Sequence, residues 1–453
     1  MLVRYISLAL LALLVPLQAR ALSRDCPYGV NAHQASDEAL EMAAEAGIGW
    51  VRFDMNWFQF EPSNNGYDWT VADRFVDHCN DLGLHVFMTL GYTPDWATGV
   101  ACNNADPNDE NWCLNKPPAN VGDWTDFVTA AVQRYSGSVK HFGMWNEPNL
   151  GQFYSGTRDQ YVDDILIPGS NAVHAACNDC YVLGPELAHL RGAEWDSCEG
   201  VCVPLLDCEC AFNGWNHSLS AILAAAGGHI DIVTHHKYGD PYTEWWDEAL
   251  DGEFIVIQII NGIKEITDQY APGKPVWITE FGWETEHLGD HTNAYGADQL
   301  ENYFYAWEQV QTGTFPTSPN QPWPELEKFF WYDLVNDDNA MTFGLLESDL
   351  DPKDPYYGYM NVIQALGNCE EGDDDDETGD DDTGDDDTGS NQYGPPNAWW
   401  HADVDDVPPN LAGTGQSNGD IAHNFVLTDQ NGDQVELYQF FGQVVVIDVF
   451  AYW

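Results

Sequence analysis

The chain has 453 residues, which leaves room for more than one domain, and its apolar fraction of 44% is that of a folded protein. Its formal net charge is −59, with 74 acidic residues against 15 Lys and Arg. Residues 370–387 hold only 13 of the acidic residues, so the rest of the chain is strongly acidic as well. So large a negative charge argues against nucleic acid and anionic membrane surfaces as partners.

Residues 1–21 have the organisation of an export signal. Arg4 precedes the apolar run Ile6–Pro16, and Ala19-Arg20-Ala21 matches an A-x-A cleavage site. The run is too short to span a membrane comfortably, and no later segment is long and apolar enough to do so. We therefore expect a secreted protein without a stable membrane span, located outside the cell, at its surface or in a periplasm.

Strand-like and helix-like segments then alternate, which predicts an α/β fold. The expected strands are Tyr28–His33, Ile48–Met55, Leu84–Gly91, Val139–Asn146, Tyr181–Glu186, Ile230–His236, Pro275–Glu280 and Lys328–Asp333. The expected helices are Ser36–Ala46 with Ser36 as N-cap, Val71–Leu82, Asp123–Tyr135, Arg158–Ala176, Leu219–Ala225, Phe254–Tyr270, Ala294–Gln311 and Tyr357–Leu366. Eight such units within residues 25–368 predict a (β/α)8 TIM barrel, because a six-stranded open sheet would leave two units over.

Eleven cysteines in an exported chain predict disulfides before metal sites. We expect Cys102 to pair with Cys113 and Cys177 with Cys180, each closing a loop or turn. Cys26 and Cys369 bracket the barrel and could join its ends, while Cys79 would be the odd thiol. Four more cysteines crowd one loop and could in principle ligate zinc, but their spacing does not match paired C-x-x-C motifs, so no metal is expected. These four are Cys198, Cys202, Cys208 and Cys210.

The C-terminal part changes composition twice. Residues 369–397 contain an acidic tract with the repeat Asp-Asp-Asp-Thr-Gly, which predicts a disordered linker. In residues 398–453, the segments Phe425–Gln430 and Gln434–Leu437 flank Asn-Gly-Asp, a hairpin signal, and Val444–Trp453 reads as a buried strand. This segment resembles the opening of a thioredoxin-like domain of the peroxiredoxin and TlpA type. One hairpin and one strand cannot bury both faces of a sheet, so we expect a truncated fragment to which no redox activity can be assigned.

Two of the expected strands end on a glutamate beside a tryptophan. Val276–Trp283 delivers Glu280, and Val139–Asn149 delivers Glu147. Because burying an unpaired carboxylate is costly, a buried strand that finishes on Glu indicates a charge that is used. Two carboxyls held at a fixed separation are the requirement of a glycoside hydrolase, and about 5–5.5 Å separates them in the retaining kind.

The residues at the strand ends resemble the clan A glycoside hydrolases, most closely family thirty-nine and its relatives. The resemblance covers about residues 26–368. In that clan, Trp-Asn-Glu-Pro ends the fourth strand and Glu ends the seventh, and here Trp145-Asn146-Glu147-Pro148 and Glu280 take these places. The clan's Arg on the second strand, its His-x-Tyr on the sixth and its Trp on the eighth correspond to Arg52, His236-Lys237-Tyr238 and Trp331.

This resemblance implies a retaining mechanism with a covalent glycosyl-enzyme intermediate and no cofactor. Glu280 would be the nucleophile, held by Arg52 and Tyr238, and Glu147 would be the general acid and base. Asn146 would bind the sugar 2-hydroxyl, and Trp331 would form the floor under the sugar at the cleaved position. Further candidates for substrate contacts lie near strand ends, namely His33, His236, Trp57, Trp96, Trp283, Tyr332, His235 and Glu186.

The leading hypothesis is therefore a secreted glycosidase that cleaves an oligo- or polysaccharide, with a carbohydrate as its partner and its oligomeric state left open. A second hypothesis is a non-catalytic carbohydrate-binding protein at the cell surface, although the presence of both Glu147 and Glu280 counts against it. A third is a thiol–disulfide protein that carries the barrel as a passenger, but the chain lacks the Cys pair this needs.

Overall fold

The computed structural model describes residues 26–102, 113–188, 215–238, 255–285, 292–313, 322–336 and 342–367, together with two short strands at 426–428 and 434–436. The chain divides into two compact units, Met1–Asp374 and Asp375–Trp453, which are described separately.

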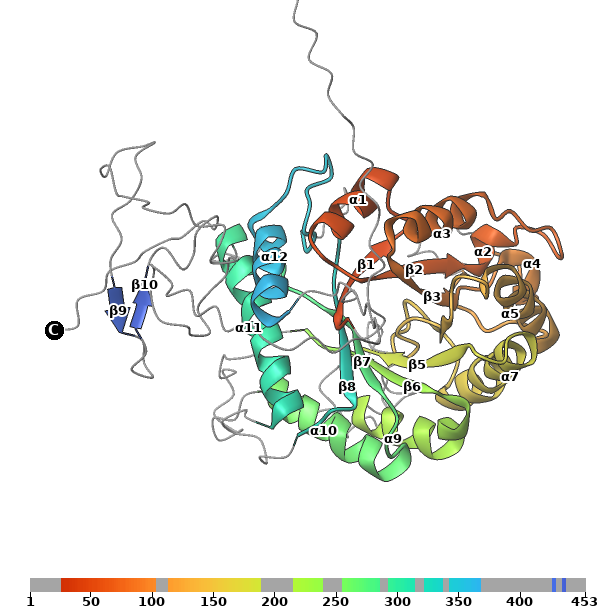
Figure 1. Cartoon of the computed structure of the whole chain (residues 1–453). Helices are drawn as coiled ribbons and strands as arrows, with labels where there is room; N and C mark the ends of the chain where they lie inside the picture. Colours follow the sequence, from red (N-terminus) through yellow and green to blue (C-terminus); the bar gives the residue numbers. More distant parts are fainter. Residues whose placement is uncertain are drawn as a thin grey trace, which may run out of the picture. The chain divides into compact units, whose positions relative to one another are not determined.

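Eight parallel strands close into a barrel in the order in which they occur along the chain (Figure 1). This confirms the predicted (β/α)8 architecture. The strands are β1 Tyr28–His33, β2 Trp50–Asn56, β3 His85–Gly91, β4 His141–Met144, β5 Tyr181–Leu187, β6 Ile232–His236, β7 Val276–Phe281 and β8 Leu326–Trp331. Most strand residues are buried, as expected of parallel strands whose two faces are both covered.

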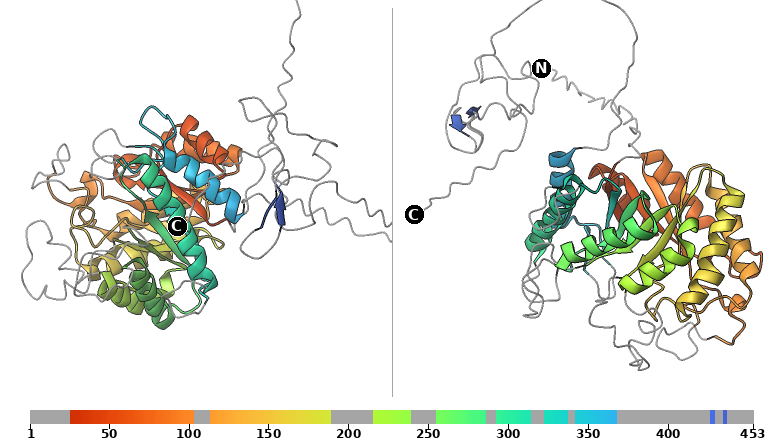
Figure 2. Two further views of the ribbon diagram at one scale, coloured as in Figure 1. Left: turned by 90° about the vertical axis from the view of Figure 1, so that its left-hand side faces the viewer. Right: turned by 90° about the horizontal axis from the view of Figure 1, so that it is seen from below.

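Helices surround the strands in all three views (Figures 1 and 2). They are α1 Asp37–Glu45, α2 Trp57–Phe60, α3 Thr70–Leu82, α4 Asp95–Thr98, α5 Val121–Tyr135, α6 Arg158–Gln160, α7 Ile167–Ala176, α9 Trp215–Ala226, α10 Ile255–Tyr270, α11 Asn293–Thr312 and α12 Asp354–Leu366. A 3-10 turn, η2, follows α9 at Gly227–His229. Ser36 caps α1 as predicted, because its side chain accepts a hydrogen bond from the Ala39 N–H.

Aromatic rings fill the interior of the barrel. The ring centroids of Trp50 and Trp277 lie 5.2 Å apart, and Phe330 stacks on Trp277 at 5.9 Å. Phe87 packs edge-on against Phe330 at 5.9 Å. The Lys328 ammonium lies over the Trp50 ring, 4.8 Å from its centroid. Much of the tryptophan content is therefore core, and these large rings support the strand ends from below.

The segment between β4 and β5 differs from the expected long strand and single helix. β4 stops at Met144 rather than Asn146, because Trp145 adopts a φ of 78° and the chain leaves the sheet there. The expected helix Arg158–Ala176 is interrupted by a π-helical turn, η1 Tyr161–Leu166. Such turns often occur at functional sites. Here the Tyr161 hydroxyl donates a hydrogen bond to the Met144 carbonyl at 2.7 Å and so fastens the end of β4.

The disulfide predictions are confirmed where the structure describes them. Cys102 is bonded to Cys113 and Cys177 to Cys180, and Cys79 is a buried free thiol on α3. Cys26 is disulfide-bonded as well. Cys369, its expected partner, and the four clustered cysteines lie outside the described residues.

In the second unit, β9 Val426–Thr428 and β10 Gln434–Glu436 form an antiparallel pair, which confirms the predicted hairpin. The expected final strand and the acidic linker lie outside the described residues, so the thioredoxin-like fragment stays a prediction. Across the described parts of both units, none of the helices has the length and apolar character needed to cross a membrane.

Candidate active site

A cavity of about 410 Å³ lies at the carboxyl ends of the barrel strands. This is the end at which TIM-barrel enzymes place their active sites. Residues from the ends of seven strands, or from the loops that follow them, line it. They are His33, Arg52, Asp54, Tyr92, Asn146, Glu147, Gln152, Phe153, Tyr238, Glu280, Tyr332 and Phe343.

Glu280 is held on both of its carboxylate oxygens. It lies near the end of β7, where its carbonyl accepts a hydrogen bond from the Lys237 N–H at 2.8 Å. The Arg52 guanidinium donates to Oε1 at 2.6 Å, and the Tyr238 hydroxyl donates to Oε2 at 2.8 Å. These two donors fix the orientation of a side chain that is only 7% exposed.

Glu147 approaches from the opposite wall of the cavity, just after β4. Its N–H donates to the Glu186 carbonyl at 3.0 Å, and two hydrogen bonds between Asn149 and Ala188 tie the same loop to the end of β5. The Glu147 carboxyl lies 2.8 Å from Nδ1 of His236, and this nitrogen lies 3.3 Å from Glu280. Oxygens of Glu147 and Glu280 and the His236 nitrogen all lie within 4.8 Å of one another.

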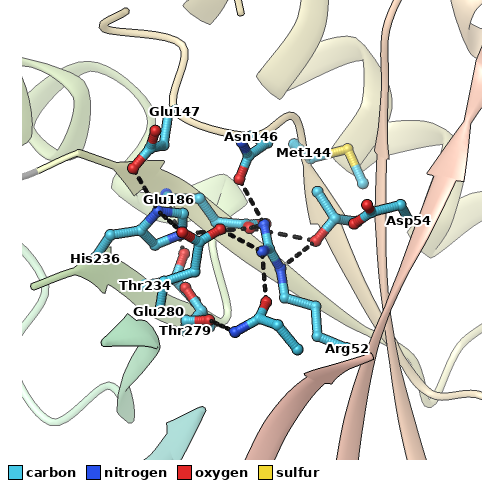
Figure 3. Close-up of polar contacts among 12 residues, drawn as sticks. Arg52, Asp54, Met144, Asn146, Glu147, Glu186, Thr234, His236, Thr279 and Glu280 are labelled. Atoms are coloured by element: carbon cyan, nitrogen blue, oxygen red, sulfur yellow. Dashed lines mark hydrogen bonds and ion pairs between the residues drawn. The ribbon is translucent and has the colours of Figure 1, made fainter. Parts of the chain in front are cut away.

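Arg52 links the strands below the cavity (Figure 3). Besides Glu280, its guanidinium contacts Glu186 at 2.5 Å, Asn146 at 2.7 Å and Asn31 at 2.8 Å. The side chain is 2% exposed, and Glu186 is fully buried. Arg52 is therefore a buried cation shared by two carboxylates, and its position sets the position of Asn146 as well.

Burial dominates the electrostatics of three titratable groups at the site. Burial raises the pKa of Glu147 to about 7, although the nearby Arg52 charge opposes this shift. Burial lowers the pKa of His236 to about 3, against the effect of Glu280, so the imidazole between the two acids is neutral at pH 7. Burial also raises the pKa of Glu186 to about 7, although Arg52 again opposes the shift.

His33 and Asp54 form an ion pair at the cavity wall. Nδ1 of His33 lies 2.7 Å from Asp54, and Nε2 lies 3.7 Å from Asp333. Burial lowers the pKa of His33, but the charges of Asp54, Asp333 and Glu280 outweigh it and raise the pKa to about 9. The ring is therefore an imidazolium at neutral pH, and its side chain is 40% exposed.

Two of the expected substrate residues do not lie where the sequence placed them. Trp331 is fully buried and its indole N–H donates to the Phe343 carbonyl, so it is not the floor under a sugar. The next residue, Tyr332, lines the cavity instead, because neighbouring residues at a strand end point in opposite directions. Trp283 packs edge-on against Tyr295 and does not line the cavity.

The other expected substrate residues are brought together. Arg52, Asn146, Tyr238 and His33 line the cavity, and His236 contacts both glutamates from beneath. Three further candidates lie outside the cavity lining. Trp57 and His235 are fully buried outside the cavity lining, and Trp96 packs on Trp57.

Several lining residues were not expected from the sequence. Asp54 follows Arg52 by two residues, so strand alternation already places it on the same face of β2. Tyr92 comes directly after β3, as a strand-end residue would. Gln152, Phe153 and Phe343 lie on loops, where the sequence carries no comparable periodic signal.

Within the part of the chain that the structure describes, two groups of side chains have donor atoms close enough together for a cation. One is Glu147, His236 and Glu280, but the Arg52 guanidinium bonded to Glu280 opposes a further positive charge there. The other contains Cys177 and Cys180, whose sulfurs are joined in a disulfide. Neither group therefore fits a resident metal ion.

The backbone around the cavity is unusual. His33, Tyr92, Trp145, Glu147 and Glu186 all have positive φ angles, between 40° and 78°. Non-glycine residues rarely adopt this conformation, and such residues cluster at functional sites. The strand ends are therefore bent at the same points that present the polar side chains.

Comparison with known proteins finds similarity to glycosidases within the barrel. A glycoside hydrolase family model described as beta-galactosidase matches residues 29–109. A beta-xylosidase of Geobacillus stearothermophilus is 26% identical over 132 residues, which cover 27% of this chain and 25% of that protein. The match thus spans about a quarter of the length of this relative.

Solved structures extend the similarity to the whole barrel. A family 39 glycoside hydrolase from Bacteroides cellulosilyticus is 20% identical, with a TM-score of 0.53 over 78% of this chain and 65% of that one. A glucosidase from Croceicoccus marinus (15% identity, TM-score 0.51, 77% and 69% coverage) and a monomeric beta-xylosidase from Caulobacter crescentus (18%, 0.50, 76% and 70%) are similar too. These similarities show that the first unit has the same (β/α)8 barrel fold as these solved glycosidases.

Proposed function

We propose that the chain is a retaining glycoside hydrolase in which Glu280 is the nucleophile and Glu147 is the general acid and base. One observation carries this proposal, namely that the two carboxyls face each other within 4.8 Å in different environments. Glu280 is bonded to a cation and a hydroxyl, whereas burial raises the pKa of Glu147 to about 7. Such an unequal pair is the arrangement that retaining glycosidases use.

In the first step, an oxygen of Glu280 bonds to the anomeric carbon while the bond from that carbon to the leaving oxygen breaks. The proton of Glu147 passes to the leaving oxygen, so the departing alcohol is neutral. Arg52 and Tyr238 orient the nucleophile, and Asn146, itself held by Arg52, lies where it can bind a sugar hydroxyl.

In the second step, water attacks the anomeric carbon and passes a proton to Glu147, and the ester bond to Glu280 breaks. Glu280 is neutral as an ester in the intermediate, which favours ionisation of Glu147 at that stage. The same side chain is therefore an acid in the first step and a base in the second. Hydrolysis ends with both residues in their starting protonation states.

The relatives' names direct the choice of substrates. Wild type should be screened on aryl β-xylosides, glucosides and galactosides, with Glu280→Gln and Glu147→Gln as matched variants. We expect both variants to lose activity on substrates with poor leaving groups. Glu147→Gln should keep its kcat/KM on a dinitrophenyl glycoside, whose leaving group needs no proton, while its kcat falls because the second step has lost its base.

A 2-deoxy-2-fluoro glycoside should leave a sugar covalently attached to Glu280, which mass spectrometry of the peptide would identify. The configuration of the released sugar can be observed by NMR. Inversion at the anomeric carbon would contradict the proposal. If wild type turns over no glycoside but binds sugars, the alternative of a carbohydrate-binding surface protein would be favoured.

We also propose that the protein is exported. The signal-like residues 1–21 support this, and so do the disulfides Cys102–Cys113 and Cys177–Cys180, since such bonds persist in oxidising compartments. Fractionation of the native host, with an antibody to the barrel, would test it. Recovery of the protein in the cytoplasm with reduced cysteines would contradict it.

A further inference from the structure

A second hollow of about 590 Å³ lies beside the catalytic cavity. It shares two of its lining residues, His33 and Tyr332, with that cavity. The other lining residues come from the end of β1, the start of α1 and the segment after β8, namely Ala32, Gln34, Ala35, Ser36, Ala39, Asp333, Val335, Ser348 and Leu350. Both hollows have volumes in the range of about 300–1,000 Å³ that is typical of ligand sites.

The order of strands fixes which side of the catalytic cavity this hollow extends. In a closed ring of eight strands, β8 and β1 are neighbours, and β8 lies diametrically opposite β4. Glu147 follows β4, whereas Tyr332 follows β8 and His33 ends β1. The second hollow is therefore on the side of the barrel mouth remote from Glu147.

This position determines which part of a substrate can enter. Under the proposed mechanism Glu147 protonates the leaving oxygen, so the leaving group departs on the β4 side, where Gln152 and Phe153 line the cavity. The far end of the sugar that is attacked then points towards His33 and Tyr332. A further sugar attached to that end would pass these two side chains to reach the second hollow, whose lining they share.

The lining suits a neutral sugar ring. The half-buried Ala35 presents a small side chain, and the half-buried Leu350 adds an apolar surface for the C–H face of a ring. The exposed imidazolium of His33, fixed by Asp54 at 2.7 Å, offers a charged donor to hydroxyl groups.

We propose that this hollow is a glycone subsite, so that the substrate is an oligo- or polysaccharide with at least one further sugar on the non-reducing side of the cleaved bond. The inference rests on the proposed function and goes beyond it by excluding a terminal monosaccharide as the preferred unit released. The enzyme would release products of two or more sugars from the non-reducing side.

The test compares nitrophenyl glycosides of one, two and three sugars, because the aryl group occupies the leaving-group side and each added sugar extends towards the hollow. For wild type, kcat/KM should rise at least tenfold from the monosaccharide to the disaccharide. Ala35→Trp, on the half-buried rim, and Ser348→Trp, on the exposed rim, should each lower the disaccharide-to-monosaccharide ratio of kcat/KM at least tenfold. The control Ser138→Trp, an exposed position before β4, should leave the ratio within twofold of wild type.

A wild-type ratio near one, or an unchanged ratio in both rim variants, would overturn the subsite while leaving the glycosidase proposal intact. The absence of hydrolysis of every nitrophenyl glycoside by wild type would overturn the proposed function itself. Because the ratio is internal to each variant, a partly unfolded preparation lowers both values and does not imitate the expected result. Analysis of the products of a polysaccharide digest provides a second test, since release of monosaccharides alone would contradict the subsite.

Discussion

Replacing Glu147 with Gln should stabilise the folded barrel at alkaline pH and not at acid pH. The carboxyl has a pKa of about 7 in the folded protein and 4.5 in the reference state. Each unit of difference corresponds to about 1.4 kcal/mol, so ionised Glu147 costs the folded state about 3 kcal/mol. Because the folded-state pKa is raised, the stability that this group contributes is complete below pH 4.5 and is lost as pH rises through 7.

The measurement is the free energy of unfolding by urea at pH 4, 6 and 8 for wild type and Glu147→Gln. The difference in favour of the variant should grow from near zero at pH 4 to about 3 kcal/mol at pH 8. Any loss of the contact with His236 adds a similar amount at each pH, so the change with pH isolates the ionisation. Glu265→Gln, at an exposed position on α10, should show no such change.

A difference that stays constant from pH 4 to pH 8 would refute the reasoning. So would a difference that grows towards acid pH, since this would mean that the native structure stabilises the ionised form of Glu147. Either result would also remove the basis for assigning Glu147 as the group that carries the proton.

The remaining predictions concern activity, the buried charges, the aromatic residues Trp331 and Tyr332, and the effect of salt. The kcat/KM of wild type should fall above an apparent pKa near 7 with a poor leaving group, because Glu147 loses its proton, and a dinitrophenyl leaving group should abolish this fall. Arg52→Met should lower the unfolding free energy by about 3–5 kcal/mol at pH 8 and by less at pH 5, where Glu186 is protonated, in urea titrations. Trp331→Phe should cost about 1–3 kcal/mol of stability without changing KM, whereas Tyr332→Ala should raise KM roughly tenfold in steady-state kinetics. Added salt should raise the thermal midpoint, since it screens a net charge of −59, and an unchanged midpoint would contradict this.

The barrel could be predicted because its signals are local. Apolar strands alternate with helical periodicity, and eight units leave few alternatives to a closed ring. The meeting of Glu147 with Glu280 follows from the same information, since parallel strands in a barrel end on the same face. This part of the prediction depends on the position of a carboxylate at the end of a buried strand.

The partners of each buried group depend on the distance across the barrel, which no local pattern contains. Glu186 ends a buried strand just as Glu280 does, and only the position of Arg52 between them shows that they share one cation. The incorrect prediction that Trp331, rather than Tyr332, contacts the sugar has a similar origin. A strand end that is wrong by one residue turns the side chain to the opposite face, so alternation alone cannot choose between two adjacent aromatic residues.

The left-handed residues at the barrel mouth carry a cost of about 1–3 kcal/mol each. At His33 and Glu147, whose side chains line the cavity, a glycine or asparagine would relieve this cost and remove the side chain that the bend presents. Selection for heat resistance alone, without an activity screen, should therefore enrich substitutions at these two positions and yield more stable but inactive barrels.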